Sequence, residues 1–262
     1  MYNPRRVINS KERRWAFDMS GTEPFKHRGP GSTCSSSTLP VRSLAVQGFI
    51  SSDDVLDRGI ALFRDSTMDY AAAKAFILAQ LQGSLPYDRT YHSYGHTLDV
   101  HRAAIDIARK EGVNGNDLML LKTAALYHDA GFVRGDVHHE VLSCDIVREA
   151  LPGFGYTTEE VDRICAMIMA TRVPQSPTDQ LSGILCDADL DYLGREDFFT
   201  IGNHLFRELK EYGILTTERA WNEIQLKFLS EHTYFTETNR RDREPRKQLH
   251  LARVVEWLER NP

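Results

Sequence analysis

The chain has 262 residues, of which 41% are hydrophobic and 26% are charged. This size and composition exclude a disulfide-stabilised miniprotein and a wholly disordered chain, and no apolar stretch is long enough for a transmembrane helix or a secretory signal. The net charge is −5, with a basic excess in residues 1–50 and an acidic excess in the rest, which argues against nucleic acid as a partner. The four widely spaced cysteines are typical of free thiols in a reducing compartment. We therefore expect a cytoplasmic protein with no membrane contact.

Residues 1–45 predict a disordered or weakly ordered extension. The segment 29–40 is rich in Gly, Ser and Pro and has no apolar period, so it cannot bury enough surface to offset its ordering entropy. A basic, Ser-rich start is also a feature of organelle transit peptides, but the acidic residues Glu12, Asp18 and Glu23 count against targeting.

Residues 46–262 predict a single all-α domain. Apolar residues recur at helical spacing, with no alternating strand pattern and no internal repeat. The expected helices, in chain order, cover residues 53–64, 68–81, 95–110, 117–127, 139–151, 159–170, 182–193, 195–212, 218–230 and 248–260. We expect Asn116 and Thr158 to cap two of them. The mixed-charge run 240–247 predicts a solvated turn before the last helix.

Two segments carry histidine or aspartate residues that are candidates for a catalytic or metal-binding site. His92 and His96 are four residues apart, so they share one face if the segment opens a helix. His128 and Asp129 follow an apolar helix, where a buried aspartate is costly without a cation or several hydrogen-bond donors.

A third segment places three carboxylates among apolar neighbours. Asp187 and Asp191 are four residues apart, and Asp189 lies on another side of the same predicted helix. Imidazole nitrogens with carboxylate oxygens suit a divalent ion such as Mn, Fe, Co, Ni, Zn or Mg. A set of two histidines and two aspartates leaves coordination positions open, as is typical of catalytic metal sites.

The order of these residues resembles the H…HD…D signature of the HD-domain metal-dependent phosphohydrolases, over roughly residues 55–235. The matching positions are His96, His128, Asp129 and Asp189. The resemblance implies an HD-domain helical bundle and names these four residues as ligands of one divalent metal ion. Asp187 is the competing choice for the last ligand, but Asp189 occupies the "AD" position of the family.

The segment 91–96 is also similar to the YHNxxH stretch of class I cyclic nucleotide phosphodiesterases. In those enzymes the first histidine protonates the leaving oxygen, so the resemblance implies this role for His92. The asparagine of that family is Ser93 in this chain. The alternative for His92 is a helix-capping or surface histidine.

Two further positions are candidates for substrate binding. His139, in His138-His139-Glu140, resembles an HE element of many HD proteins that helps to bind substrate or a second metal. No histidine lies between His139 and His204, which favours one metal over two. Arg172 follows a helix and offers a guanidinium to a phosphate group. The alternative for His139 is a solvated histidine, and the alternative for Arg172 is a surface salt bridge.

These residues together predict a metal-dependent phosphohydrolase. It would hydrolyse a phosphoester bond of a small phosphorylated molecule, with a nucleotide as the favoured substrate, through water activated by the metal. Asp129 would ligate the metal and orient the water, and His92 would donate a proton to the leaving oxygen. The alternatives are a cyclic nucleotide phosphodiesterase, a diiron oxygenase on the same fold and a non-catalytic regulatory HD module. A homo-oligomer is compatible with the sequence.

Overall fold

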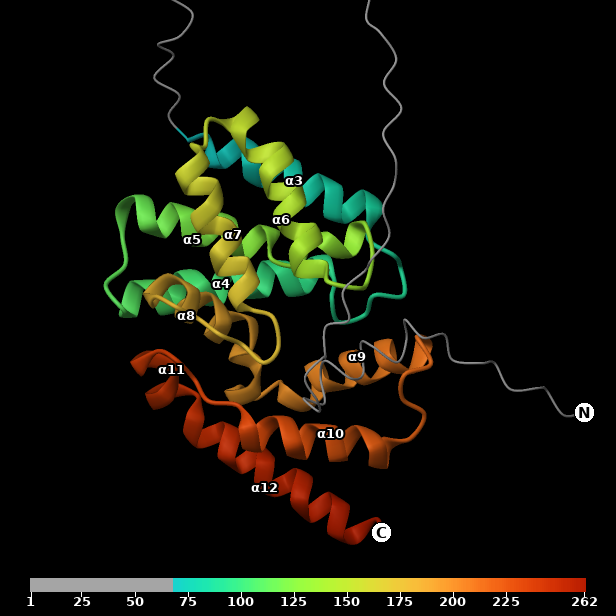
Figure 1. Ribbon diagram of the computed structural model, residues 1–262. Coiled ribbons are helices and arrows are strands. Elements are labelled where there is room, and N and C mark those ends of the chain that lie inside the picture. Colours follow the sequence, from blue (N-terminus) through green and yellow to red (C-terminus); the bar gives the residue numbers. More distant parts are fainter. Residues whose placement is uncertain (1–67) are drawn as a thin grey trace, which may run out of the picture. The chain divides into compact units, whose positions relative to one another are not determined.

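The computed structural model describes residues 68–262, and all regular secondary structure in this range is helical (Figure 1). The elements are α3 (Tyr70–Ser84), α4 (Tyr94–Lys110), α5 (Gly115–Tyr127), η1 (Ala130–Val133), α6 (His139–Ala150), η2 (Leu151–Phe154), α7 (Thr158–Ala170), α8 (Gln180–Asp189), η3 (Asp191–Gly194), α9 (Phe198–Glu211), α10 (Glu218–Glu231), α11 (Glu237–Asp242) and α12 (Glu244–Arg260). The predicted all-α fold is confirmed. The predictions for residues 1–45 and for a helix over 53–64 lie outside the described residues. None of the helices described has both the length and the apolar character that a membrane span requires.

Two helices have their N-cap one or two residues earlier than the sequence predicts. The N-cap of α5 is Asn114 rather than Asn116. The N-cap of α7 is Thr157 rather than Thr158, because Thr157 is the residue spaced to form a capping box with Glu160. The Thr157 hydroxyl accepts a hydrogen bond from the Glu160 amide, and the Glu160 carboxylate accepts one from the Thr157 amide.

Two predictions about the C-terminal half are wrong. The helix expected over 182–193 is divided at Leu190 into α8 and η3. The run 240–247 is not a solvated turn, since it contains the end of α11 and the start of α12. Its charged side chains are used in packing: Arg243 Nε donates to Asp191 Oδ1 at 2.7 Å, and Arg240 Nε donates to the Tyr234 carbonyl at 2.9 Å.

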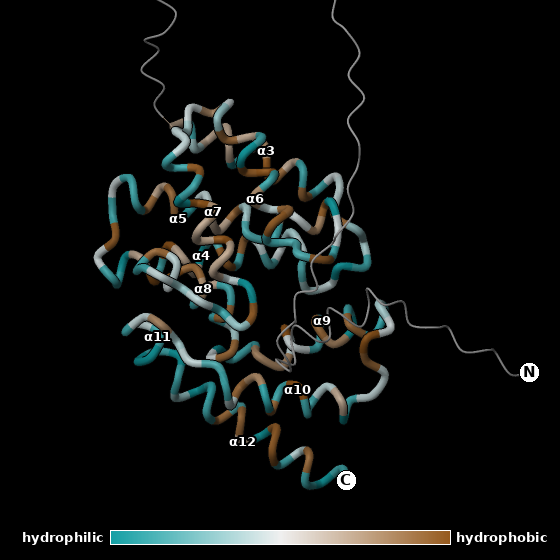
Figure 2. Tube along the Cα trace, in the orientation of Figure 1, coloured by the Kyte–Doolittle hydropathy of each residue, from teal (hydrophilic) through white to brown (hydrophobic). Residues whose placement is uncertain are grey.

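The apolar side chains form two cores. One lies among α3 to α8, with Leu121 and Ile164 fully buried. The other lies among η3, α9, α10 and α12, around Trp221 and Leu229. The same division is visible in the helices, where α3 to α8 gather in one group and α9 to α12 in another (Figures 1 and 2). Burial of these side chains stabilises each group by the hydrophobic effect.

The chain passes from the first core to the second at the end of α8. Ala188 belongs to the first core, and Leu190, Tyr192 and Leu193 belong to the second. Asp189 therefore lies at the boundary between the two groups of helices, which is where the candidate site is found.

Candidate active site

His96 lies in the first turn of α4, and its position follows from the cap of that helix. Ser93 is the N-cap, and its hydroxyl accepts a hydrogen bond from the His96 amide at 3.3 Å. Serine is among the residues that cap helices best. His128 directly follows α5, and its Nδ1 donates to the Ala125 carbonyl at 3.0 Å. This hydrogen bond leaves the lone pair of His128 Nε2 available to a metal ion.

Asp129 is held in place by a close approach of two segments at Gly131. A Cβ atom at Gly131 would overlap the carbonyl oxygen of His139, so only glycine fits there. The Ser143 hydroxyl completes the contact, because it accepts from the Gly131 amide and donates to the His128 carbonyl, each at 2.7 Å. The turn after α5 is thereby fixed against the start of α6.

The three aspartates at the end of α8 face three different neighbours. Asp187 is fully buried and accepts hydrogen bonds from the amides of Phe235 and Thr236, each at 2.8 Å. Asp191 accepts from Arg243 Nε at 2.7 Å. Only Asp189 of the three faces the histidines. Asp187, the competing choice for the metal, is instead used to anchor the segment after α10.

Four of the predicted side chains meet at one point, and we call them the donor cluster: His96, His128, Asp129 and Asp189. His96 Nε2 lies 3.4 Å from His128 Nε2, 3.4 Å from Asp129 Oδ2 and 3.2 Å from Asp189 Oδ1. His128 Nε2 lies 3.3 Å from Asp129 Oδ2 and 3.5 Å from Asp189 Oδ1. These residues are brought together from α4, the turn after α5 and the end of α8.

The members of the donor cluster perturb one another's protonation. Burial opposes a proton on His96, but the nearby carboxylates of Asp129 and Asp189 outweigh it and raise its pKa to about 9. The same two carboxylates raise the pKa of His128 well above its ordinary value against the effect of burial. Burial raises the pKa of Asp189, but the two histidines lower it to about 2. The carboxylates therefore stay ionised at neutral pH.

The donor cluster fits a divalent cation. Asp129 Oδ2 is buried and has no hydrogen-bond partner in the structure, which is costly for a carboxylate unless a cation is bound. Two imidazole nitrogens and two carboxylate oxygens are a donor set that Mn, Fe, Co, Ni and Zn accept. Such a set leaves positions for water and for a substrate oxygen.

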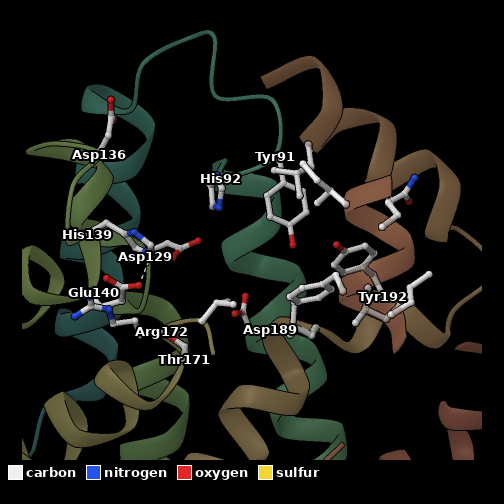
Figure 3. A pocket seen from close by; sticks show the side chains of 18 of the residues that line it. Tyr91, His92, Asp129, Asp136, His139, Glu140, Thr171, Arg172, Asp189 and Tyr192 are labelled. Atoms are coloured by element: carbon white, nitrogen blue, oxygen red, sulfur yellow. Dashed lines mark ion pairs between the residues drawn. The ribbon is translucent and has the colours of Figure 1, made fainter. Parts of the chain in front are cut away.

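His92 extends into a cavity beside the donor cluster, and a buried glutamate that the sequence reasoning missed holds it there (Figure 3). His92 Nδ1 lies 2.5 Å from Glu208 Oε1. Glu208 is 1% exposed and also accepts from the amides of Tyr91 and His92, at 2.8 and 3.1 Å. Burial raises the pKa of Glu208, but His92, the Tyr91 amide and Arg89 lower it to about 2. An ionised carboxylate only accepts, so His92 Nδ1 must be the donor, and Nε2 is the ring nitrogen that can exchange a proton with a ligand.

Arg89 is the second residue that the sequence reasoning missed. Its Nη1 donates to Glu208 Oε1 at 2.8 Å, and its guanidinium also pairs with Asp136. The guanidinium lies over the rings of Phe132 and Tyr212, 4.4 Å from each centroid. Arg89 and Glu208 are 119 positions apart in the chain, and neither belongs to a local motif. No signal in the sequence could have paired them.

His139 and Glu140 lie beside the donor cluster at the start of α6. His139 Nε2 is 3.4 Å from Asp129 Oδ1 and 3.5 Å from Glu140 Oε1. His138, the N-cap residue of α6, has a left-handed backbone with φ of 58°, a conformation that is rare outside glycine. This turn brings His139 to the cavity wall, so the structure places it with the donor cluster rather than in solvent.

Arg172 also lines the cavity, after the end of α7 (Figure 3). Arg172 is half-buried in the cavity wall, which differs from the alternative of a surface salt bridge. The cavity contains Asp129 and Asp189 of the donor cluster, with Tyr91 and Tyr192 on its wall. Cationic, ionised and hydroxyl groups thus surround one end of the cavity, an arrangement suited to a phosphate ester near a metal ion.

The other end of the cavity is formed by α9 and α10 and is mostly apolar. Its lining residues include Phe198, Leu205, Trp221, Ile224 and Phe228. No local pattern in the sequence predicts this wall, because it depends on how two helices meet.

The sequence matches a known domain over the region that carries the donor cluster. Residues 93–191 match the family model of the HD domain. None of the curated proteins matches the chain. The apolar wall of α9 and α10 lies beyond the matched residues.

Two solved structures of one bacterial protein support the same fold. YpgQ of Bacillus subtilis, in complex with ADP, is similar with a TM-score of 0.53 and 22% identity, over 74% of this chain and 94% of that chain. Another structure of YpgQ gives a TM-score of 0.52 and 22% identity, over 74% and 98%. A predicted HD superfamily hydrolase from an uncultured Thermotogales bacterium has 24% identity and a TM-score of 0.49, over 72% and 92%.

Proposed function

Since this chain belongs to the HD-domain superfamily, we propose that it is a metal-dependent phosphohydrolase that cleaves a phosphoester bond of a small molecule, with a nucleotide as the favoured substrate. The observation that carries the proposal is the donor cluster, which meets the cavity where His92 and Arg172 also lie. A divalent cation bound there would polarise a phosphoryl oxygen and lower the pKa of water.

The residues of the chain divide the remaining work. Asp129 accepts a hydrogen bond from the attacking water and orients it towards phosphorus. Arg172 neutralises charge on the phosphoryl oxygens as they become more negative. His92, with Nδ1 fixed by Glu208, donates a proton from Nε2 to the leaving oxygen. Imidazole is suited to this transfer near neutral pH.

Two observations favour particular phosphoesters. YpgQ, which shares the fold, was solved with ADP, and this supports a nucleotide as the first class to test. His92 faces the cavity and is oriented by a buried carboxylate, which supports a cyclic nucleotide as the second candidate, because opening a cyclic phosphodiester also needs a proton donor for the leaving oxygen.

The test is a substrate panel with defined metals. The full-length protein is stripped with a chelator and reloaded with Mn²⁺, Mg²⁺, Co²⁺, Ni²⁺, Zn²⁺ or Fe²⁺. Linear nucleotides and other phosphate esters are then assayed for release of phosphate, and cyclic nucleotides are assayed for formation of the ring-opened nucleoside monophosphate. We expect turnover with at least one linear or cyclic nucleotide, and only after metal is restored. Full turnover in the metal-free protein would refute the mechanism.

Asp129→Ala tests whether metal binding and hydrolysis depend on the donor cluster itself or on the loss of any carboxylate. We expect this variant to lose bound metal and hydrolysis together. The matched control is Asp145→Ala on α6, where the carboxylate is 47% exposed and lies 3.9 Å from Arg148. Elemental analysis of the native protein gives a third readout: about one metal per chain agrees with the proposal, two irons indicate the oxygenase alternative, and none indicates a regulatory module.

A further inference from the structure

Two buried cysteines face each other where α6 packs against α7 (Figure 1). Cys144 lies on α6 and Cys165 on α7, both thiols are free, and the exposed fractions of the two residues are 2% and 3%. Cys144 Sγ donates a hydrogen bond to the Cys165 carbonyl at 3.6 Å, and Cys165 Sγ donates one to the Cys144 carbonyl at 3.8 Å. Because each sulfur reaches across to the backbone of the other residue, the two thiols lie side by side.

The two thiols also interact with each other. The hydrogen bond with Cys165, together with burial, raises the pKa of the Cys144 thiol well above its ordinary value. The hydrogen bond from Cys144 outweighs burial at Cys165 and lowers the pKa of that thiol. The thiolate is the reactive form of cysteine, so Cys165 is the sulfur that an oxidant attacks first. Cys144 lies beside it, in the position of a resolving thiol.

Cys186 is the third cysteine in the described part of the chain, and its surroundings differ from those of the pair. It lies on α8 and is fully buried, and its thiol donates to the Ala170 carbonyl at 3.2 Å. Burial raises the pKa of this thiol. A buried thiol with a raised pKa is a small core group that reacts poorly, so Cys186 serves as a control for the pair.

The cysteine pair lies between two helices that support the candidate site. Cys144 follows Ser143, whose hydroxyl holds the turn after α5 through the Gly131 amide and the His128 carbonyl. Arg172 of the cavity wall comes shortly after the end of α7. A covalent bond between α6 and α7 would therefore hold together two supports of the donor cluster.

We propose that Cys144 and Cys165 form a reversible disulfide that joins α6 to α7 without disturbing their packing, and that hydrogen peroxide is the oxidant. The reciprocal contacts bring the two sulfurs to the same place between the helices, so we expect the bond to form by rotation of the two side chains. Disulfides in reducing compartments are usually transient ones that respond to oxidants. This inference does not depend on the proposed function.

The reaction has two steps. The Cys165 thiolate attacks one oxygen of the peroxide, so that an S–O bond forms, the O–O bond breaks, and the leaving oxygen takes up a proton and departs as water. The Cys144 sulfur then attacks the Cys165 sulfur, so that the S–S bond forms and the S–O bond breaks with loss of a second water. The sulfurs are oxidised and the peroxide is reduced. A dithiol reverses the reaction by exchange.

The first experiment identifies the bond by mass spectrometry. The full-length protein is reduced, freed of reductant and incubated with hydrogen peroxide until its thiol content is constant. The remaining thiols are alkylated with N-ethylmaleimide in guanidinium chloride before digestion with trypsin. We expect the tryptic peptides 135–148 and 164–172 to be joined, and to separate after treatment with dithiothreitol. Absence of this linked pair, a link to Cys186 in its place, or a link that forms only in protein unfolded beforehand would overturn the inference.

Matched variants test the pairing and the order of the steps. Cys144→Ala and Cys165→Ala should each lose the linked peptides, whereas Cys186→Ala, which removes another buried thiol, should keep them. Loss of the link from all three variants would contradict the pairing. In Cys144→Ala the sulfenic acid of Cys165 has no resolving thiol, so dimedone should trap it. Greater trapping of Cys144 in the Cys165→Ala variant would refute the assignment of Cys165 as the sulfur attacked first.

The second experiment compares the melting temperatures of the reduced and the oxidised protein. A disulfide that closes the loop between positions 144 and 165 restricts the unfolded chain, so we expect oxidation to raise the melting temperature by about 5 °C or more. The same treatment should leave the melting temperature of Cys144→Ala unchanged. A melting temperature that does not rise in the native protein would show that the bond strains the packing of α6 on α7. An equal rise in Cys144→Ala would place its cause elsewhere, and either result overturns the inference.

Discussion

Replacing Glu208 by glutamine tests whether the buried carboxylate stabilises the fold and orients His92. Glu208 receives hydrogen bonds from Arg89, from the amides of Tyr91 and His92, and from the His92 ring. These contacts lower its pKa from 4.5 to about 2. A shift of this size corresponds to about 3 kcal/mol of stability, present when the carboxylate is ionised.

The pH dependence of this contribution has a defined sign. A carboxyl group whose pKa is lower in the folded protein than in the unfolded chain stabilises the fold above its unfolded pKa, here 4.5, and loses that effect as the pH falls towards about 2. Glu208→Gln should therefore lower the free energy of unfolding by about 3 kcal/mol at pH 7. The difference from the native protein should shrink steadily below pH 4.5.

Urea unfolding followed by circular dichroism from pH 7 to pH 3 measures both effects. The control is Glu211→Gln, which changes an exposed glutamate on the same helix. A loss at pH 7 below about 1 kcal/mol, or a loss that does not change with pH, would refute the reasoning. At neutral pH the same variant should also lower kcat, because the amide at position 208 holds the His92 ring less firmly than a carboxylate.

Three further predictions concern the donor cluster and its supports. Asp189→Asn should abolish metal retention. Asp187→Asn should keep the metal but lower the melting temperature, because Asp187 accepts hydrogen bonds from the amides of Phe235 and Thr236. Loss of metal from both variants would contradict this division of roles. Gly131→Ala should destabilise the protein by about 2 kcal/mol or more, since its methyl group would overlap the His139 carbonyl, and denaturant unfolding with Gly153→Ala as the unhindered control measures it. Metal binding at pH 7 should release protons, because the pKa of His96 in the metal-free protein is raised to about 9. Calorimetry in buffers of different ionisation enthalpy measures this release, and detecting none would refute the assignment. The raised pKa also stabilises the metal-free protein below pH 6.5, and this stabilisation is lost as the pH rises through about 9.

The sequence predicted the parts of this protein that depend on local patterns. Helical periodicity identified most helices, because it reflects which face of each segment is buried. The signature residues His96, His128, Asp129 and Asp189 were predicted as neighbours from a resemblance, and the structure brings them together. The helix ends were less predictable, since they depend on which residue has the right spacing for a capping hydrogen bond.

The supports of the site could not be predicted, because they arise from contacts between distant segments. Glu208 looks like any polar residue on an amphipathic helix until α9 packs beside Tyr91 and His92. Asp187 and Asp189 are the same residue type on one helix, so apart from the resemblance to the family only their contacts distinguish them, such as the hydrogen bonds from Thr236 to Asp187. The apolar wall of the cavity likewise requires α9 and α10 to meet near the end of α8.

The five residues from Asp187 to Asp191 join the two groups of helices, and each aspartate there is tied to a different partner. Asp187 accepts a hydrogen bond from the amide of Thr236, just before α11, and Asp191 accepts one from Arg243, just before α12. A cation bound at Asp189 would reduce the mobility of this same five-residue segment. Protection of the α10–α12 amides from hydrogen exchange should then rise with metal occupancy, although none of those helices contributes to the donor cluster.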